Sequence, residues 1–166
     1  MTDDKIVLDE CFALQAELDT EIAKNHDVTY ENTFSRRVLA LLVELGEFAN
    51  ETRCFKYWSY KGPSEKAIIL DEYADGLHFL LSLGVMMGVS QYTHHFHVRT
   101  KDLTEAILMV YQDVVELKEH FDPEHYAKAF ADYLNIIPLF DYSLEEVLEA
   151  YFSKCKANHV RQETHY

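Results

Sequence analysis

The sequence contains little glycine and little proline, with five and three residues respectively among 166. These residues supply the turns that join short strands, so their scarcity argues against a fold built from many strands. Hydrophobic residues make up 48% of the chain, which is enough for one buried core and excludes an intrinsically disordered protein. We therefore expect long helices in a single domain spanning residues 1–166.

Basic residues are also scarce. Fifteen Lys and Arg stand against 29 Asp and Glu, so the formal net charge is 15 − 29 = −14. A surface of that sign repels phosphate backbones and anionic lipids, so we expect neither nucleic acid nor a membrane as a partner. A phosphate-bearing ligand would need divalent cations or a local cluster of basic side chains.

The three cysteines, Cys11, Cys54 and Cys155, form an odd set without a CxxC spacing. They predict reduced thiols rather than a disulfide framework or a thiolate zinc site. The first ten residues, MTDDKIVLDE, lack the basic flank and apolar core of a signal peptide, and charged residues interrupt the longest apolar-rich run. We expect a soluble, cytoplasmic protein.

Apolar residues recur at three- and four-residue intervals, and no sustained alternation of period two occurs. This pattern predicts an all-α, single-domain bundle of five to six helices. The expected helices span about 5–24, 30–55, 64–89, 102–120, 123–134 and 143–158. The stretch SQYTHHFHVRT at residues 90–100 has no clear period and is predicted to be a loop.

Capping signals mark several of these helix ends. Ser64 follows a Gly-Pro breaker pair and is expected to cap the third helix. Asp102 and Ser143 are each followed three residues later by glutamate, which predicts two capping boxes. Asp122 precedes a proline at the first position of the fifth helix.

Two pairs of acids interrupt the most apolar segments. Glu44 and Glu47 lie in VELGEFANE, and Glu72 and Asp75 lie in DEYADGLH. Residues three apart share one face of a helix, so each pair points to one place. A solvated face would explain either pair alone, but a carboxylate among apolar residues is costly without a counter-charge.

Small residues flank both acid pairs, including Gly46 and Gly76, and they are predicted to let the two helix backbones approach closely. Four converging carboxylates would need a counter-charge, and hard oxygen ligands at this density suit Mg²⁺, with Mn²⁺ as a substitute. A di-iron centre calls for two Glu-x-x-His motifs, which only Asp75 with His78 approximates. The sequence thus predicts a divalent-metal site, for which nucleotide phosphates are the usual partner.

Three segments, two of which contain these acid pairs, occur in this order along the chain: ELGEFANETRCFKYWS, EYADGLHFLLSLG and KANHVRQ. They resemble the first metal motif with its Phe-Lys-x-Trp-Ser extension, the second metal motif and the C-terminal phosphate-binding segment of the dimeric, all-α dUTPase family. This family is a branch of the all-α NTP pyrophosphatases. The resemblance implies a homodimer that hydrolyses dUTP to dUMP and pyrophosphate and keeps uracil out of DNA, with dUDP as a candidate second substrate.

The resemblance also implies roles for individual residues. Mg²⁺ ions would be held by Glu44, Glu47, Glu72 and Asp75. The nucleoside would be contacted by Gln15, Trp58 and His78, and the phosphates by Lys56, Lys154, Asn158 and Arg161. A glutamate of the first pair would be the catalytic general base, and Glu44 is favoured over Glu47.

The residues leave two alternatives to dUTP hydrolysis open. Leu18 and Asp19 follow Gln15 where parts of the family have an asparagine, so a related enzyme acting on dCTP or a non-standard nucleotide is a second reading. A helical protein-interaction module is a third reading, and a regulatory protein partner is compatible with the acidic surface. The histidines at 94, 95 and 97 lack an acid partner at helical spacing and favour a solvated or interface loop over a transition-metal site.

Overall fold

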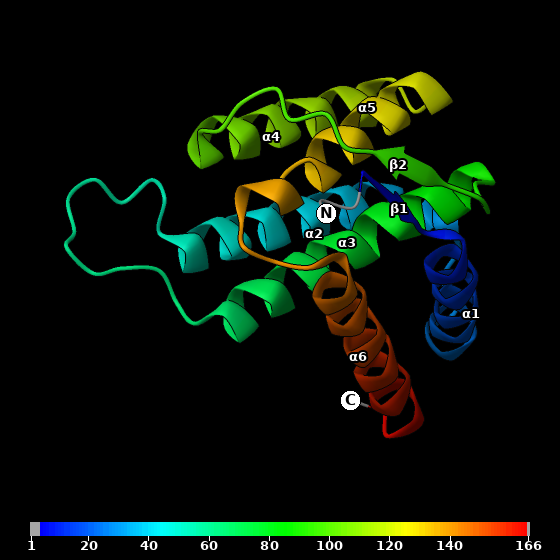
Figure 1. Cartoon of the computed structure of the whole chain (residues 1–166). Helices are drawn as coiled ribbons and strands as arrows, with labels where there is room; N and C mark the ends of the chain where they lie inside the picture. The colour runs from blue at the N-terminus through cyan, green and yellow to red at the C-terminus, as the bar shows by residue number, and fades with distance from the viewer. Residues whose placement is uncertain (1–3, 166) are drawn as a thin grey trace.

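The computed structural model describes residues 4–165, which form a helical domain (Figure 1). Its helices are α1 (Asp9–His26), α2 (Tyr30–Thr52), α3 (Lys66–Met87), α4 (Leu103–Glu119), α5 (Pro123–Leu134) and α6 (Leu144–Glu163). The other regular elements are two short strands, β1 (Lys5–Val7) and β2 (Thr93–His95), and a 3-10 turn at Ile137–Leu139. The prediction of an all-α single domain with five to six helices is confirmed.

Helix α3 occupies the centre of the domain. It packs against α1, α2 and α6 and touches α5, while α4 and α5 pack together above α2 (Figure 1). Leu77, Leu80 and Leu81 of α3 are fully buried, because apolar residues occur all round this helix. Within residues 4–165, none of the helices combines the length and the apolar character needed to cross a bilayer.

Two glycines of α3 let tyrosines of α5 reach its backbone. A Cβ atom on Gly84 or Gly76 would collide with the hydroxyl of Tyr126 or Tyr133 respectively. The Tyr126 hydroxyl donates a 2.8 Å hydrogen bond to the carbonyl of Leu80. These buried hydroxyls are therefore satisfied only because no side chain occupies the glycine positions.

The predicted role of the glycines beside the acids needs correction. At Gly46 the nearest atom to an added Cβ is the hydroxyl of Tyr111, at 3.2 Å, and at Gly76 it is that of Tyr133. Both tyrosines belong to helices other than α2 and α3. The glycines thus make room for tyrosine side chains instead of bringing the α2 and α3 backbones together.

The first helix begins at Asp9 and not near Lys5 as predicted, and within the predicted loop at residues 90–100 only Thr93–His95 forms a strand, β2. Strand β1 pairs antiparallel with β2, with Lys5 opposite His95 and Val7 opposite Thr93. Only Ile6 of β1 is buried, so the alternation lasts three residues, which is too short to stand out as a period-two pattern. The pairing anchors the start of α1 against the middle of the chain.

Two ends of the connection between α2 and α3 differ from the prediction. Helix α2 ends at Thr52 because Arg53 adopts a left-handed conformation, with φ 58°. Helix α3 begins at Lys66 and not at Ser64, and the Ser64 hydroxyl donates to the side chain of Glu51 instead of capping the helix. Residues 53–65 form an arm that projects from the helices (Figure 1).

The remaining capping predictions are largely confirmed. Asp122 caps α5 and is followed by proline, and Ser143 forms the reciprocal box that opens α6. The Asp102 carboxylate accepts from the first turn of α4, but its own N–H donates to Thr100 Oγ1 at 3.1 Å, so only half of that box forms. Helix α6 continues past residue 158 to Glu163.

Candidate active site

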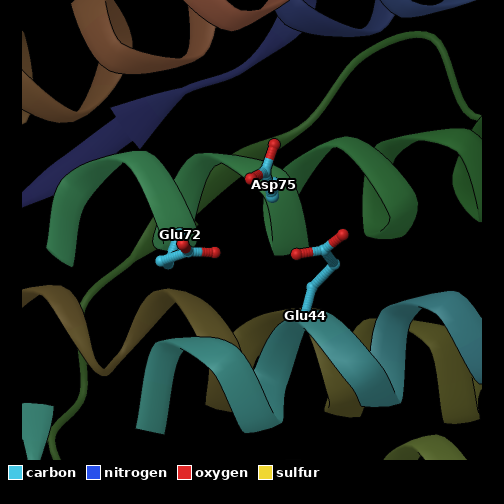
Figure 2. A group of neighbouring side chains, drawn as sticks. All are labelled: Glu44, Glu72 and Asp75. Atoms are coloured by element: carbon cyan, nitrogen blue, oxygen red, sulfur yellow. The ribbon is translucent and has the colours of Figure 1, made fainter. Parts of the chain in front are cut away.

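Carboxylates from α2 and α3 meet between these helices. One oxygen from each of Glu44, Glu72 and Asp75 lies within 4.8 Å of the others, and all three residues are partly buried. Figure 2 shows Glu44 pointing from α2 toward α3, which carries the other two acids. The buried Oε2 atoms of Glu44 and Glu72 have no hydrogen-bond partner among the described residues. Unpaired carboxylate oxygens grouped in this way are suitable ligands for a hard divalent cation.

The acids disfavour one another's ionisation. Burial, together with the nearby Asp75 and Glu47 carboxyls, raises the pKa of Glu44 to about 8. Burial and the same two neighbours raise the pKa of Glu72 to about 7. Burial also raises the pKa of Asp75, although Lys154 works against that change. A bound cation would favour the ionised forms and remove this penalty.

Lys154 of α6 supplies a positive charge to the cluster. Its Nζ atom lies 3.2 Å from Asp75 Oδ1 and 2.9 Å from Asp71 Oδ1, and its side chain is mostly buried. Arg161 donates to Asn158 Oδ1 at 3.2 Å, and its charge, like that of Lys154, opposes the rise in the pKa of Asp75. The cationic end of α6 therefore faces the acids that the sequence predicted to be metal ligands.

Glu47 lies at the open side of the cluster. Its side chain is exposed but hydrogen-bonds with that of Glu44. Together with Glu51 and Glu72 it lines an open cavity of 490 Å³. The four acids singled out in the sequence are thus arranged as three clustered carboxylates with a fourth at their edge.

A second cavity, of 320 Å³, adjoins the cluster, because Asp75 belongs to the cluster and also lines this cavity. It lies between α1, α2, α3 and the end of α6. Its apolar wall comprises Leu18, Ile22, Val28, Ala40 and Phe79, and its polar groups include Gln15, Asp19, Arg37, His78, Ser82 and Asn158. A mostly apolar concavity with a few convergent polar groups is the usual form of a small-molecule site.

Gln15 and His78 provide buried polar groups in this cavity, with 3% and 5% of their surfaces exposed. Gln15 Oε1 lies 2.6 Å from His78 Nδ1 and accepts a hydrogen bond from the Tyr151 hydroxyl at 3.1 Å. Burial lowers the pKa of His78 to about 4, so the ring is neutral at pH 7. Its Nε2 atom has no hydrogen-bond partner in the described part of the chain.

Comparison with known proteins agrees with these features. A family model described as dUTPase matches residues 7–166, which is nearly the whole chain. The chain belongs to the all-α dUTPase family. As a member, it is a dUTP diphosphatase, a nucleoside triphosphate pyrophosphohydrolase, and dUTPases generally depend on divalent metal ions. A search of curated proteins found no match.

Two of the substrate residues expected of a dUTPase lie on the projecting arm. Trp58 is 63% exposed and packs its ring edge-on against Phe55 and Tyr57, while Lys56 Nζ lies 5.8 Å from the Phe55 ring centroid. Neither Trp58 nor Lys56 lines the 320 Å³ cavity within residues 4–165. The two residues that the dUTPase motif assigns to the substrate thus lie on the arm and not in the 320 Å³ cavity of their own chain.

Several polar residues of the dUTPase pocket were not among the predicted site residues. Asp19 accepts a 3.0 Å hydrogen bond from Gln15 Nε2, and Arg37 donates to Ser82. The four-residue spacing of Gln15 and Asp19 could have linked them, since such residues share a helix face. Arg37, Ser82 and Tyr151 reach the site from other helices, and no local pattern indicates them.

The histidine stretch also differs in part from its prediction. His94 lies in β2 and is buried, whereas a solvated or interface loop was expected. Its Nε2 atom is 2.8 Å from Asn135 Oδ1, so the ring is held by a hydrogen bond to the end of α5.

Proposed function

We propose that this dUTPase converts dUTP to dUMP and pyrophosphate with Mg²⁺ held by Glu44, Glu72 and Asp75. The observation that carries this proposal is the cluster of partly buried acids with orphaned oxygens, which adjoins a nucleoside-sized cavity. Glu47 would complete the ligand set from its edge. Mn²⁺ has a similar preference for oxygen ligands and should substitute.

Bound Mg²⁺ would supply charge neutralisation on the phosphate oxygens and polarise the attacking water. Glu44 is our candidate for the general base, because its carboxylate lies in the cluster that would hold the metal ion and its attacking water. The water oxygen bonds to phosphorus, its proton passes to Glu44, and the anhydride bond between the first and second phosphates breaks. The same chemistry applied to dUDP would release dUMP and phosphate.

The remaining residues would bind and orient the substrate. Gln15 and His78 would contact the nucleoside in the cavity. Lys154 would exchange its contact with Asp75 for the phosphate chain, and Asn158 and Arg161 of the same helix would also contact phosphates. The positive charges of Lys154 and Arg161 would stabilise negative charge that develops on the leaving pyrophosphate.

We also propose that the enzyme is a homodimer. Trp58 and Lys56 lie on the projecting arm and do not line the 320 Å³ cavity of their own chain, which favours a role in the nucleotide site of a second copy. Exposed apolar side chains on α2 and α4 offer a surface for such a copy; they are Leu39, Val43, Leu108 and Val115. Light scattering during size-exclusion chromatography would test this. The three free thiols fit a reducing compartment, and we propose a cytoplasmic location.

The test is pyrophosphate release from a panel of dUTP, dUDP, dCTP and non-standard deoxynucleotides, with Mg²⁺, Mn²⁺ or EDTA. We expect turnover of dUTP with either metal ion and none with EDTA. Glu72→Gln should abolish turnover, whereas Glu149→Gln, at an exposed site on α6, should not. Preference for dCTP would overturn the uracil assignment, and metal-independent turnover would overturn the metal site.

A further inference from the structure

We propose that Asp19 is a positioning residue that determines which ring nitrogen of His78 carries the proton, and thereby gives the nucleoside pocket a hydrogen-bond acceptor. This inference rests on the proposed function, because it concerns how that pocket recognises its substrate. It is carried by a chain of three buried side chains, Asp19, Gln15 and His78, that line the same cavity.

Asp19 is the fixed end of this chain. Only 4% of its surface is exposed, and its carboxylate accepts hydrogen bonds from Gln15 Nε2 at 3.0 Å, Ser82 Oγ at 2.8 Å and the Tyr30 hydroxyl at 3.1 Å. Arg37 NH1 lies 3.7 Å from Asp19 Oδ1. A carboxylate can only accept, so every neighbouring group must present a donor to it.

Asp19 therefore fixes the orientation of the Gln15 amide. The amide has one donor end and one acceptor end. Because Nε2 must face Asp19, Oε1 must face His78 Nδ1, at 2.6 Å, and the Tyr151 hydroxyl, at 3.1 Å. An opposite orientation would place the Gln15 oxygen against the carboxylate of Asp19.

The orientation of Gln15 in turn fixes the tautomer of His78. A carbonyl oxygen only accepts, so the proton of the neutral imidazole must be on Nδ1. Nε2 is then an acceptor, and it is the buried atom that has no partner among the described residues. The ring belongs to the cavity wall, so the missing donor is expected from the ligand.

A deoxyuridine nucleotide offers two such donors, the base N3–H and the sugar 3′-hydroxyl. Cytosine presents a lone pair at N3, which would oppose the lone pair of His78 Nε2. Leu18, the pocket residue next to Asp19, has no polar side-chain atom with which to read the base. His78 Nε2 is therefore an unpaired acceptor in the cavity wall that a hydrogen-bond donor of the nucleoside can use.

The direct test is ¹⁵N NMR of the histidine rings in the free protein, since the shifts of the two ring nitrogens distinguish the tautomers. Wild type should have His78 protonated on Nδ1. In Asp19→Asn, the new amide can keep its oxygen toward Tyr30 and Ser82 only by turning its amino group toward Gln15. Gln15 should then rotate and donate to His78 Nδ1, which moves the proton to Nε2.

The kinetic test uses dUTP, N3-methyl-dUTP and 2′,3′-dideoxyuridine triphosphate. For wild type, kcat/KM should fall with the analogue that lacks the donor, by roughly tenfold to a hundredfold. A loss with the methyl analogue assigns the donor to the base, and a loss with the dideoxy analogue assigns it to the sugar. In Asp19→Asn, kcat/KM for the analogue that wild type discriminates against should lie closer to kcat/KM for dUTP.

Glu17→Gln, an exposed acid on the same helix, is the control and should change neither the tautomer nor the selectivity. If Asp19→Asn does not fold, Gln15→Met removes the acceptor for His78 Nδ1 and should abolish the single-tautomer spectrum. The inference is overturned if wild-type His78 carries its proton on Nε2. It is also overturned if a folded Asp19→Asn protein keeps the wild-type tautomer or, where that variant does not fold, if Gln15→Met keeps it. A third refuting result is that wild type turns over both analogues as efficiently as dUTP.

The two proposals fail separately. The tautomer is measured without nucleotide, so it stands even if wild type releases no pyrophosphate from dUTP, which would overturn only the proposed function. Conversely, normal dUTP turnover with an unchanged tautomer in a folded Asp19→Asn protein would overturn the role of Asp19 and leave the function intact.

Discussion

Replacing Glu44 by glutamine should stabilise the metal-free protein at alkaline pH while it abolishes metal binding. The folded-state pKa of Glu44 is raised from 4.5 to about 8, by burial first and then by Asp75, Glu47 and Glu72. Between these two pH values the folded state binds more protons than the unfolded state, so the stability that depends on Glu44 falls as pH rises through that window. Glutamine has no proton to lose and avoids the penalty.

The size of the effect follows from the pKa difference. A change from 4.5 to about 8, at 1.36 kcal/mol for each tenfold change in proton affinity, gives (8 − 4.5) × 1.36, or at most about 5 kcal/mol. Glu44 is only partly buried, so solvent screening reduces this to roughly 1–3 kcal/mol. For a chain of this length, about 2 kcal/mol corresponds to a rise in Tm of roughly 4–8 °C.

Thermal unfolding in EDTA provides the assay. At pH 9 the Tm of Glu44→Gln should exceed that of wild type by this amount, and at pH 4 the two should agree. Adding Mn²⁺ at pH 8 should raise the Tm of wild type, since a ligand that binds only the folded state stabilises it, and should leave the variant nearly unchanged. Glu149→Gln, on the exposed side of α6, should follow wild type throughout.

A variant that melts at or below the wild-type temperature at pH 9 would refute this reasoning, because it would mean that Glu44 stabilises the metal-free fold. A gain that is equal at pH 4 and pH 9 would refute it too. Such a gain would come from packing or helix propensity and not from charge.

Three further predictions concern other parts of the molecule. Lys154→Met should lower the Tm more in EDTA than in saturating Mn²⁺, because the metal ion would then supply the positive charge; equal losses would contradict this. Trp58→Ala should leave the Tm within about 1 °C of wild type, since the ring is exposed, and should raise KM for dUTP. An unchanged KM would show that Trp58 does not contact the substrate. Gly84→Ala should destabilise the fold by about 1–3 kcal/mol in urea melts, because its Cβ meets the hydroxyl of Tyr126. Gly62→Ala, with nothing within 4 Å, is the matched control.

The sequence predicted those features that depend on local spacing. Helix periodicity gave the six helices, and i, i+3 spacing put Glu72 and Asp75 on one face of α3. Their meeting with Glu44 followed from a physical argument about the cost of isolated buried charge. These features could be predicted because each depends on neighbours in the sequence or on one strong energetic requirement.

Features that depend on distant partners could not be predicted. The burial of Asp19 becomes intelligible only when Ser82, 63 residues away, donates to it. The strand at residues 5–7 forms because Ile6 and its neighbours pair with β2. Three residues are too few for a period-two pattern to be distinguished from the start of a helix. Trp58 was assigned to the uracil pocket by its motif, whereas its exposed ring does not line the 320 Å³ cavity of its own chain.

The arm at residues 53–65 joins the two helices that carry the acid cluster, yet contributes none of its three carboxylates. The distance between those carboxylates is set by the packing of α2 on α3, so the length of the arm is free to vary. Doubling a flexible loop costs only about 0.6 kcal/mol in closure entropy. Insertions between α2 and α3 should therefore preserve the acid cluster while they change how far Trp58 reaches. Related enzymes could diversify their substrates by altering this arm, without any change to the helices that hold the acids.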